Sequence, residues 1–329
     1  MTTTTTTVLV TGGAGYIGSV LIGQLLAGGY SVRTIDNLIY GGESLLPYIT
    51  HPRFEFCRGD IRQARDVTTA LKGVAAVVHL AAVVGDKACR QNESLAVAVN
   101  RDASRMLYEQ ARETGVERFV FASTCSNYGV SRNSDTPVDE TAPLHPVSLY
   151  AELKVGFEQY LKQHHGRRPA VTCLRFATAY GLSSRPRFDL TVNEFTRDLL
   201  AGLKLEIYCR RSWRPYCHAV DLARACVAVL QSGPELVAGQ TFNVGDSSEN
   251  YRKESVVELI LKELSLPDDR VSFVDRTDDP RDYRVDCRRI GTELGFSVTR
   301  KVPDGIREIA SAIASGLIDN PRDPRYRNI

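Results

Sequence analysis

The sequence predicts an α/β fold, in which a doubly wound parallel sheet carries helices on both faces and a smaller C-terminal lobe follows. Short runs rich in Val, Ile and Phe alternate with amphipathic stretches from Val8 to Phe176, a pattern typical of a parallel sheet that is covered on both sides. After Gly181 the alternation gives way to clusters of Arg and Pro. The 329 residues suffice for one large domain with a smaller one attached.

The expected strands, in chain order, are residues 8–10, 31–35, 53–58, 74–80, 119–123 and 171–176. The expected helices include residues 16–27, 95–114, 148–164 and 190–201, where apolar residues recur at helical spacing. The first residues, a Met and six Thr, lack the basic and apolar regions of a signal peptide. We therefore expect a disordered leader over 1–7, a sheet domain over 8–180, and a second lobe that takes up most of 181–329 and could return strands to the sheet.

Composition argues against several classes of protein. The 41 basic and 39 acidic residues leave a formal net charge of +2, so we expect no nucleic-acid partner. Eight Cys and six His show no C-x-x-C pair and no metal-ligand spacing, which predicts free thiols in a reducing cytoplasm and no metal site. No apolar run approaches the length of about 18 residues that a membrane helix needs, so we expect no membrane association.

A glycine-rich loop follows the first expected strand. Gly12, Gly15 and Gly18 form a G-x-x-G-x-x-G pattern between that strand and the helix that begins at Tyr16. Glycines let the backbone turn tightly and approach a pyrophosphate, whose charge is stabilised by free N–H groups and the helix dipole. The loop therefore predicts a dinucleotide site of the Rossmann type.

Two acidic residues extend this prediction. Asp36 ends the second expected strand eighteen residues after Gly18, where a carboxylate accepts hydrogen bonds from ribose hydroxyls and repels a 2′-phosphate. This favours NAD over NADP, although Arg33 nearby argues the other way. Asp60 and Ile61 follow the third expected strand, where they would meet the adenine edge; an N-cap of the next helix is the alternative for Asp60.

A tyrosine and a lysine share one face of an expected helix. Tyr150 and Lys154 are four residues apart, so their side chains lie on the same side. A tyrosine has a pKa of about 10, but an adjacent ammonium and a nicotinamide cation would favour the phenolate. Tyr150 could then accept a proton from a substrate alcohol. Hydroxyl groups over residues 123–129, at the end of a strand, would lie nearby.

The segments 11–18, Asp36, 79–82, Asn100, 123–129, 150–154 and 174–176 together resemble the extended short-chain dehydrogenase/reductase family of NAD-dependent nucleotide-sugar epimerases and dehydratases. The similarity runs from about residue 8 to residue 315. It implies a Rossmann-type sheet with a smaller substrate-binding lobe, NAD as cofactor and a nucleotide-diphosphate sugar as substrate. It also implies a homodimer formed through helices 95–114 and 148–164.

The resemblance assigns roles to individual residues. Thr124 would be the hydroxyl partner of Tyr150 and Lys154, and Asn100 would hold helix and sheet backbone together. The implied cofactor contacts are Gly12, Gly15, Tyr16, Ile17, Gly18, Asp36, Asn37, Asp60, Ile61, Leu80, Ala81, Ala82, Asn100, Tyr150 and Lys154, with Leu80 to Ala82 beneath the nicotinamide.

The C-terminal half supplies the implied substrate contacts. Arg214 resembles the family's arginine for the substrate diphosphate, and Asn193 and Arg281 fall where the family contacts nucleotide or phosphates; solvated surface arginines are the alternative. Thr178 stands where the family usually has Asn. Tyr283 aligns with a bulky position that disfavours a large N-acyl group on the sugar. His218, near a helix expected to begin at about Asp221, is interpreted as structural.

The residues after Thr124 bear on the reaction. Family dehydratases place an acid pair there, whereas this chain has Cys125 and Ser126, so 4,6-elimination lacks its acid and base. A 4-epimerase, which needs only transient oxidation to a keto-sugar, is favoured. The alternatives are a 4-ketoreductase, which often prefers NADPH, a 3/5-epimerase and, ranked below them, a 4,6-dehydratase of the same family.

In a 3/5-epimerase Cys125 or Ser126 would be catalytic, although a family cysteine of this kind stands at the position of Ser126, and Cys125 could be a small buried thiol. Cys89 is equally ambiguous. A non-catalytic NAD-binding regulator is the non-enzyme alternative, and the intact Thr124, Tyr150 and Lys154 argue against it.

Overall fold

The computed structural model describes residues 6–130, 136–164, 166, 168–274 and 279–328. Its central sheet has seven parallel strands in the order β10-β6-β5-β4-β1-β2-β3. The strands are β1 (Thr7–Thr11), β2 (Ser31–Asp36), β3 (Phe54–Arg58), β4 (Ala76–His79), β5 (Arg118–Thr124), β6 (Ala170–Phe176) and β10 (Gln240–Val244). The strand order reverses between β1 and β4, which opens a crevice at their carboxyl ends. The predicted doubly wound α/β fold is confirmed.

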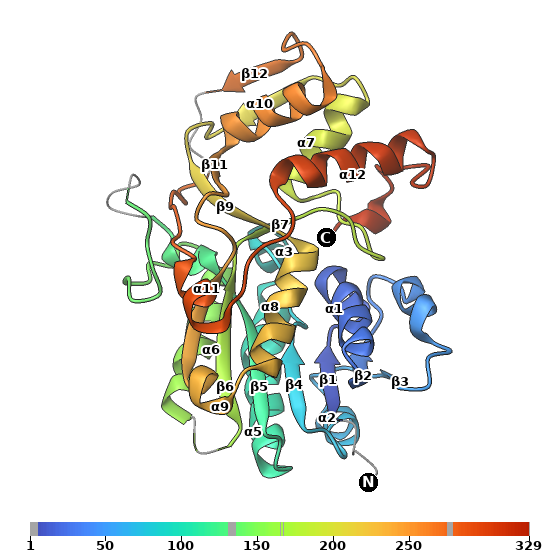
Figure 1. The fold of residues 1–329 in the computed structure, drawn as a ribbon, viewed down its shortest axis with the longest axis vertical. Helices are drawn as coiled ribbons and strands as arrows, with labels where there is room; N and C mark the ends of the chain where they lie inside the picture. The colour runs from blue at the N-terminus through green and yellow to red at the C-terminus, as the bar shows by residue number, and fades with distance from the viewer. Residues whose placement is uncertain (1–5, 131–135, 165, 167, 275–278, 329) are drawn as a thin grey trace.

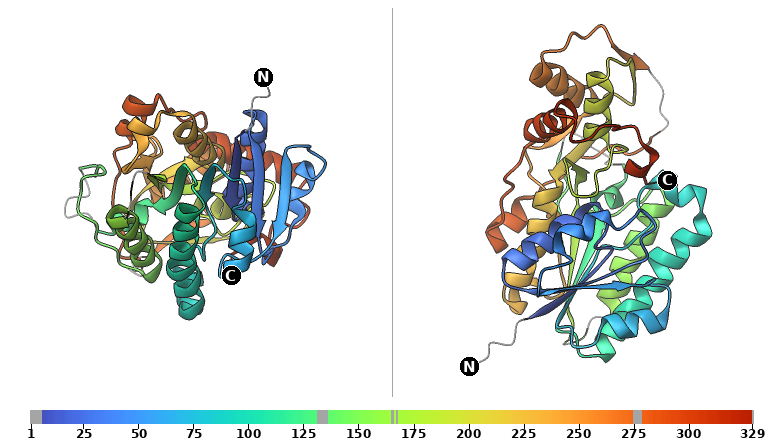
Figure 2. Two further views of the ribbon diagram at one scale, coloured as in Figure 1. Left: turned by 90° about the horizontal axis from the view of Figure 1, so that it is seen from below. Right: turned by 90° about the vertical axis from the view of Figure 1, so that its right-hand side faces the viewer.

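Alternating side chains along the strands divide the core into two layers. Val8 and Val10 belong to one buried cluster and Leu9 to the other. Helices α1 (Tyr16–Ala27) and α8 (Ala219–Gln231) cover the first face, and α2 (Ala64–Ala70), α5 (Ser104–Glu113) and α6 (Leu149–His164) cover the second. Figure 2 shows the sheet between these two groups of helices.

The C-terminal lobe lies beyond the carboxyl edge of the sheet, at the top of Figure 1. Its core packs α7 (Thr191–Leu200), α10 (Lys253–Leu264) and α12 (Val302–Ala314) together. Beside them lie two small sheets: β7 (Thr178–Tyr180), β9 (Trp213–His218) and β11 (Asn250–Arg252) form one, and β8 (Leu205–Tyr208) and β12 (Val271–Val274) form the other. The lobe therefore faces the crevice between β1 and β4.

Short elements complete the fold. They are η1 (Glu43–Tyr48), α3 (Asp86–Gln91), α4 (Glu93–Val97), the π-helical turn η2 (Ala98–Ala103), η3 (Cys125–Tyr128), α9 (Pro234–Val237), α11 (Arg288–Leu294) and η4 (Pro324–Tyr326). Of these, α3, α4, η2 and η3 contribute residues to the cavity described below, and Arg327 and Asn328 do so directly after η4.

Several sequence expectations are corrected. Thr7 pairs with Ser31 in the sheet, so the expected leader does not extend over 1–7; residues 1–5 lie outside the described part. The expected helix 95–114 is divided into α4, η2 and α5. The helix at Asp60 begins only at Ala64, with Gln63 as its N-cap, so Asp60 does not cap it. The sequence allowed for strands that return to the sheet from beyond residue 181, and β10 is such a strand, paired with β6.

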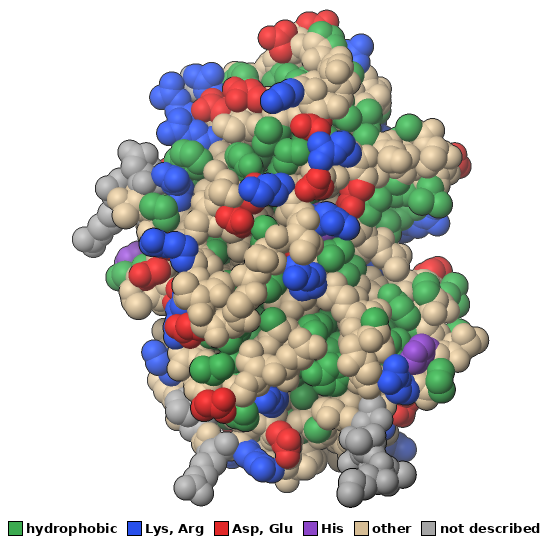
Figure 3. All heavy atoms as spheres, viewed as in Figure 1, with side chains coloured by type: hydrophobic (Ala, Val, Ile, Leu, Met, Phe, Trp, Pro, Cys, Tyr) green, Lys and Arg blue, Asp and Glu red, His purple; other side chains and the backbone are tan. Residues whose placement is uncertain are grey.

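The surface of the described residues carries mixed charge. Basic and acidic side chains lie interspersed over the face drawn in Figure 3. No described helix is long and apolar enough to cross a membrane. Among the described residues, no group of three or more His, Cys, Asp or Glu is arranged to hold a metal ion.

Candidate active site

A cavity of about 1020 Å3 lies between the carboxyl edge of the sheet and the C-terminal lobe, at the upper end of the range for small-molecule sites. Of the predicted site residues it is lined by Gly12, Gly15, Tyr16, Ile17, Gly18, Asp36, Asn37, Asp60, Ile61, Leu80, Ala81, Ala82, Thr124, Ser126, Tyr150, Lys154, Thr178, Arg281 and Tyr283. Asn100, Cys125, Asn193 and Arg214 are not part of this lining.

The glycine loop forms a cradle that only glycine leaves open. A Cβ on Gly18 would lie 2.2 Å from the carbonyl oxygen of Gly12, and one on Gly12 would lie 2.9 Å from the Cα of Ala81. Gly12 also has a φ of +74°, a conformation that other residues adopt at a cost. No side chain of the described residues caps the start of α1, so its first N–H groups are available to bind an anion.

Asp36 is fixed at the end of β2 by its neighbours. One carboxylate oxygen accepts from the N–H of Ala14 at 3.0 Å and the other from the N–H of Leu38 at 2.8 Å. Burial nevertheless raises the pKa of this carboxyl. Arg33 points elsewhere, because its guanidinium bonds to Glu55 and to two backbone carbonyls. Arg33 therefore has a structural role, and it no longer argues for NADP.

The remaining cofactor residues divide into two groups. Asp60 and Ile61 line the cavity, but the guanidinium of Arg62 binds both carboxylate oxygens of Asp60, and this lowers the pKa of Asp60. Asn100 accepts from the N–H of Val83 and donates to the carbonyl of Val83, each at 2.8 Å. Asn100 thus holds the loop after β4 from behind, and its predicted place among the cofactor contacts is corrected.

Thr124, Tyr150 and Lys154 all line the cavity. Strand β5 ends at Thr124, whose Oγ1 accepts from the N–H of Ser126 at 3.1 Å. Lys154 donates from Nζ to the carbonyl of Ala122 at 2.7 Å, and its Nζ lies 5.9 Å from the centre of the Tyr150 ring.

The two ionisable groups of this set are both buried. Burial lowers the pKa of Lys154 to about 8 and raises the pKa of Tyr150 well above its ordinary value. The phenolate expected from the sequence is therefore disfavoured in the protein alone, and the charge of an oxidised nicotinamide is needed to favour it.

Cys125 and Ser126 face different ways. The Cys125 thiol is buried and donates to the carbonyl of Arg175 at 3.2 Å, and burial raises its pKa. Ser126 lines the cavity, with its Oγ 3.4 Å from the Tyr283 hydroxyl. The candidate catalytic role of Cys125 is therefore corrected, because the turn η3 directs its side chain into the core. Cys89 is also buried, with its pKa raised to about 11.

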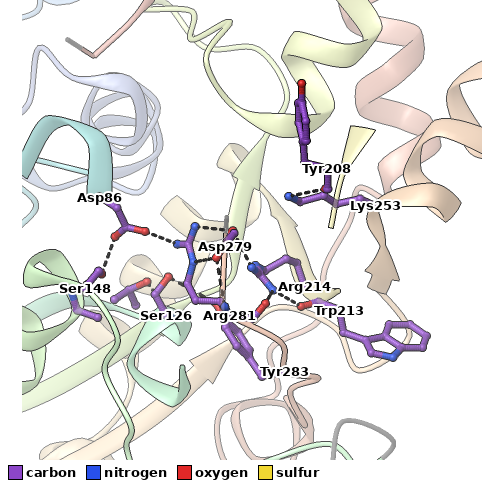
Figure 4. A network of polar contacts seen from close by, with 12 residues as sticks. Asp86, Ser126, Ser148, Tyr208, Trp213, Arg214, Lys253, Asp279, Arg281 and Tyr283 are labelled. Atoms are coloured by element: carbon purple, nitrogen blue, oxygen red, sulfur yellow. Dashed lines mark hydrogen bonds and ion pairs between the residues drawn. The ribbon is translucent and has the colours of Figure 1, made fainter. Parts of the chain in front are cut away.

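The predicted phosphate arginines meet one carboxylate, as Figure 4 shows. Asp279 binds Arg214 at 2.9 Å and Arg281 at 2.8 Å. Arg281 also binds Asp86, which begins α3, at 2.9 Å, and Asp86 accepts from the Ser148 hydroxyl at 2.6 Å. The paired guanidinium groups hold the pKa of Asp279 well below its usual range. This chain of charges joins the C-terminal lobe to the sheet domain.

Two other residues of the lobe are structural. Asn193 bonds to both backbone groups of Gly181 and to the carbonyl of Arg187, so its predicted contact with substrate is corrected. His218 caps α8 by accepting from the N–H of Val220 and contacts Glu308 at 2.7 Å, in agreement with the structural interpretation.

Comparison with known proteins agrees with this geometry. The model of the NAD dependent epimerase/dehydratase family matches residues 8–245. The chain belongs to this family. The predicted family resemblance is thereby confirmed, and with it the expectation of an NAD-dependent family enzyme.

This family member is similar over most of its length to enzymes of two kinds. It is 32% identical over 311 residues to a dTDP-glucose 4,6-dehydratase from Streptomyces griseus, covering 92% of each chain. It is 32% identical over 306 residues to a UDP-glucose 4-epimerase from Mycolicibacterium smegmatis, covering 91% of this chain and 95% of that one. A dTDP-glucose 4,6-dehydratase structure from Streptomyces venezuelae with NAD bound matches at a TM-score of 0.83 and 30% identity, covering 94% of this chain and 98% of that one.

The residues present fit the family cofactor. The cradle of Gly12 and Gly18 would hold a diphosphate against the start of α1, and Asp36 would accept from ribose hydroxyls. Ala81 and Ala82, which line the cavity, leave room for a flat ring. This enzyme of the family therefore has a formed NAD site on the sheet side of its cavity.

Sequence reasoning missed several charged residues of this site. Asp86, Asp279, Arg185 and Arg187 all line the cavity, but no local spacing links them to one another. A buried pair of Glu158 and Arg175 lies behind β5 at 2.8 Å. Its signal was available, since Glu158 follows Lys154 by one helical turn and so shares its face of α6.

Proposed function

We propose that this enzyme is a nucleotide-sugar 4-epimerase that works through a transient 4-keto sugar. The observation that carries the proposal is the strand end at Thr124: the partner residues Tyr150 and Lys154 are in place, while Cys125 is turned into the core and Ser126 reaches the cavity. The site thus keeps the groups for oxidation and reduction of an alcohol and lacks the acid pair for elimination.

The proposed proton transfers involve Tyr150. Its oxygen accepts the proton of the sugar 4-hydroxyl as the C4–O bond becomes a carbonyl, and it returns that proton when the carbonyl is reduced. When bound in the cradle beside Asp36, NAD would supply the hydride acceptor and donor for C4. If the keto sugar rotates in the site between the two steps, the hydride returns to the opposite face of C4 and the other C4 stereoisomer forms. The proton and the hydride removed are both returned, so the product is an isomer of the substrate.

Lys154 and Thr124 support Tyr150. The ammonium of Lys154 is fixed by the Ala122 carbonyl, and its charge favours the phenolate of Tyr150. Thr124 lines the same cavity, and we assign its hydroxyl the role of donor to the substrate oxygen. With a pKa of about 8, Lys154 carries its charge at neutral pH.

The substrate diphosphate belongs to the C-terminal side. Arg281 lines the cavity and Arg214 shares its carboxylate partner, Asp279. Bidentate guanidinium groups suit phosphate oxygens, so a diphosphate would take over the position that Asp279 holds between them. Thr178 and Tyr283 would contact the sugar or its phosphates from the same lobe.

The assembly and location rest on the family resemblance. A homodimer through the faces of α5 and α6, which pack side by side, and a cytoplasmic location are part of this proposal. Size-exclusion chromatography with light scattering measures the first. A monomer at micromolar concentration would contradict the dimer and leave the reaction open.

The test is incubation with UDP-, dTDP-, GDP- and CDP-hexoses in deuterium oxide, with products analysed by NMR and mass. A C4 stereoisomer without carbon-bound deuterium supports the proposal. Deuterium at C3 or C5 would indicate enolate chemistry instead. A product lighter by one water would make the enzyme a dehydratase, and turnover only with a keto-sugar and added reduced cofactor would make it a 4-ketoreductase.

A further inference from the structure

Arg185 occupies an unusual position on the wall of the cavity. It comes from the loop after β7, its side chain is only 6% exposed, and it lines the cavity. Its guanidinium lies 4.3 Å from the centre of the Tyr40 ring, just beyond β2. Electrostatic interaction with Asp36 and Tyr40 places Arg185 beside the cofactor half of the site.

The charge of Arg185 is not matched by a carboxylate contact. No ion pair within the described residues includes it, whereas its neighbour Arg187 donates from two nitrogens, Nε and Nη2, to the carboxylate of Asp189. Of its five N–H donors, one bonds to the Asn328 side chain at 2.5 Å and another to the Arg327 carbonyl at 3.1 Å. Its Nε is buried and has no partner among the described residues.

A buried guanidinium without a counter-ion is costly. Burial and the charge of Arg187 lower the pKa of Arg185 to about 10, as expected for a buried cation that has no described carboxylate in direct contact. The start of α1, with its free N–H groups, contributes Tyr16 to the same cavity, and Tyr16 interacts electrostatically with Arg187. A diphosphate held at α1 would therefore lie between the helix and the loop that carries Arg185 and Arg187, here named the arginine loop.

The segment from Pro324 to Asn328 holds the arginine loop in place. The N–H of Phe188 donates to the carbonyl of Tyr326 at 2.8 Å, and the two rings pack edge to face at 5.7 Å. The N–H of Asn328 donates to Asp189 at 3.2 Å. Asn328 and Arg327 themselves line the cavity, so this segment, here named the strap, forms part of its wall.

We propose that Arg185 binds the diphosphate of the cofactor from the side opposite α1, and that the strap positions it through Asn328. The C-terminal lobe then holds both ligands: the sugar nucleotide through Arg214 and Arg281, and the cofactor through Arg185. Residues 324–328 thereby control how firmly the cofactor is retained. The proposal rests on the NAD site of the family and not on which sugar carbon reacts.

The experiment measures binding of NAD, ADP, adenosine and NADP to cofactor-free protein by calorimetry. Arg185→Gln is expected to weaken NAD and ADP about 10- to 100-fold and to leave adenosine within about twofold, because only the first two carry the diphosphate. Asn328→Ala should weaken ADP by about 3- to 10-fold. Arg322→Ala is the control, since Arg322 precedes the strap and its side chain is half-exposed; it should leave ADP affinity within about twofold.

The outcomes distinguish the alternatives. Equal loss of ADP and adenosine, or no loss of either, would overturn the proposal. A loss confined to NADP would mean that Arg185 binds a 2′-phosphate, which also overturns it. If circular dichroism shows that Arg185→Gln does not fold, Arg185→Lys replaces it. ADP affinity should then fall less than expected for Arg185→Gln, because Lys keeps the charge but not the bidentate geometry. ADP binding needs no turnover, so failure of the epimerase proposal would leave this result intact.

Discussion

The cofactor half of the cavity is built from backbone groups, whereas the substrate half is built from charged side chains. Gly12, Gly18 and the N–H groups around Asp36 belong to one short stretch of chain, and their positions follow from the turn between β1 and α1. Arg214 and Arg281 instead depend on Asp279 and on Asp86 from the other domain. A backbone cradle is preorganised, while ion pairs can exchange partners when a ligand arrives.

The largest expected effect lies where the two halves meet. Tyr150→Phe removes the oxygen that exchanges the substrate proton, so we expect kcat to fall by about 100- to 10,000-fold with NAD affinity nearly unchanged. Tyr160→Phe is the matched control, because Tyr160 lies on the same helix and its hydroxyl bonds to Glu109. Steady-state rates and NAD calorimetry measure both. A Tyr150→Phe rate within tenfold of the native rate would exclude a proton-transfer role.

The backbone cradle should break on addition of one methyl group. Gly18→Ala places a Cβ against the carbonyl of Gly12, and such overpacking costs about 1–3 kcal/mol, so we expect NAD affinity to fall by up to about 100-fold. Gly156→Ala in α6 is the control, because a Cβ there meets nothing within 4 Å. It should keep NAD affinity and gain up to about 1 kcal/mol of stability. Equal NAD affinity in both variants would show that the cradle is not rigid.

Burial of Lys154 in the site should lower the stability of the folded protein. Its pKa falls from 10.5 to about 8 on burial, so the unfolded state binds more protons between those values and native stability rises with pH there. The free energy of unfolding of Lys154→Met at pH 7 should exceed that of the native protein by about 2 kcal/mol. The pKa shift corresponds to about 3 kcal/mol, from which about 1 kcal/mol is subtracted for the lost hydrogen bond. Urea unfolding should show this advantage constant below pH 8 and shrinking toward pH 10.5. A difference that does not change with pH would remove the explanation.

Sequence patterns predicted the parts of the molecule whose conformation is set by residues close together in the chain. Spacing within one or two elements predicts the first six strands of the chain, α1, the cradle and the Tyr150 and Lys154 pair. The Asp86 to Arg281 contact and the Arg185 to Asn328 contact join segments that are far apart in sequence, so no spacing encodes them. Cys125 and Asn193 were misplaced for the same reason: the direction of their side chains is set by the turn η3 and the loop at Gly181 that they pack against.

The substrate half should respond in the opposite direction to the cradle. Asp279→Asn removes the charge that occupies Arg214 and Arg281, so affinity for UDP or dTDP should rise by about tenfold, the equivalent of about 1.4 kcal/mol. Calorimetry with the free nucleotides measures it. Asp269→Asn, an exposed residue of the same lobe, is the control. Weaker nucleotide binding in Asp279→Asn would mean that Asp279 orients the arginines for substrate and does not compete with it.

The smallest effect is expected at Cys125, the residue that follows Thr124. Its thiol is buried and bonded to the Arg175 carbonyl, and burial raises its pKa, so it is a poor acid for the sugar and lies outside the cavity lining. Cys125→Ala should change kcat by less than about twofold, as should Cys226→Ala, a buried thiol on α8. Rates and deuterium incorporation are measured together. A large loss of rate confined to Cys125→Ala, with deuterium at C3 or C5 in the native product, would show that the turn η3 opens and that enolate chemistry replaces transient 4-oxidation.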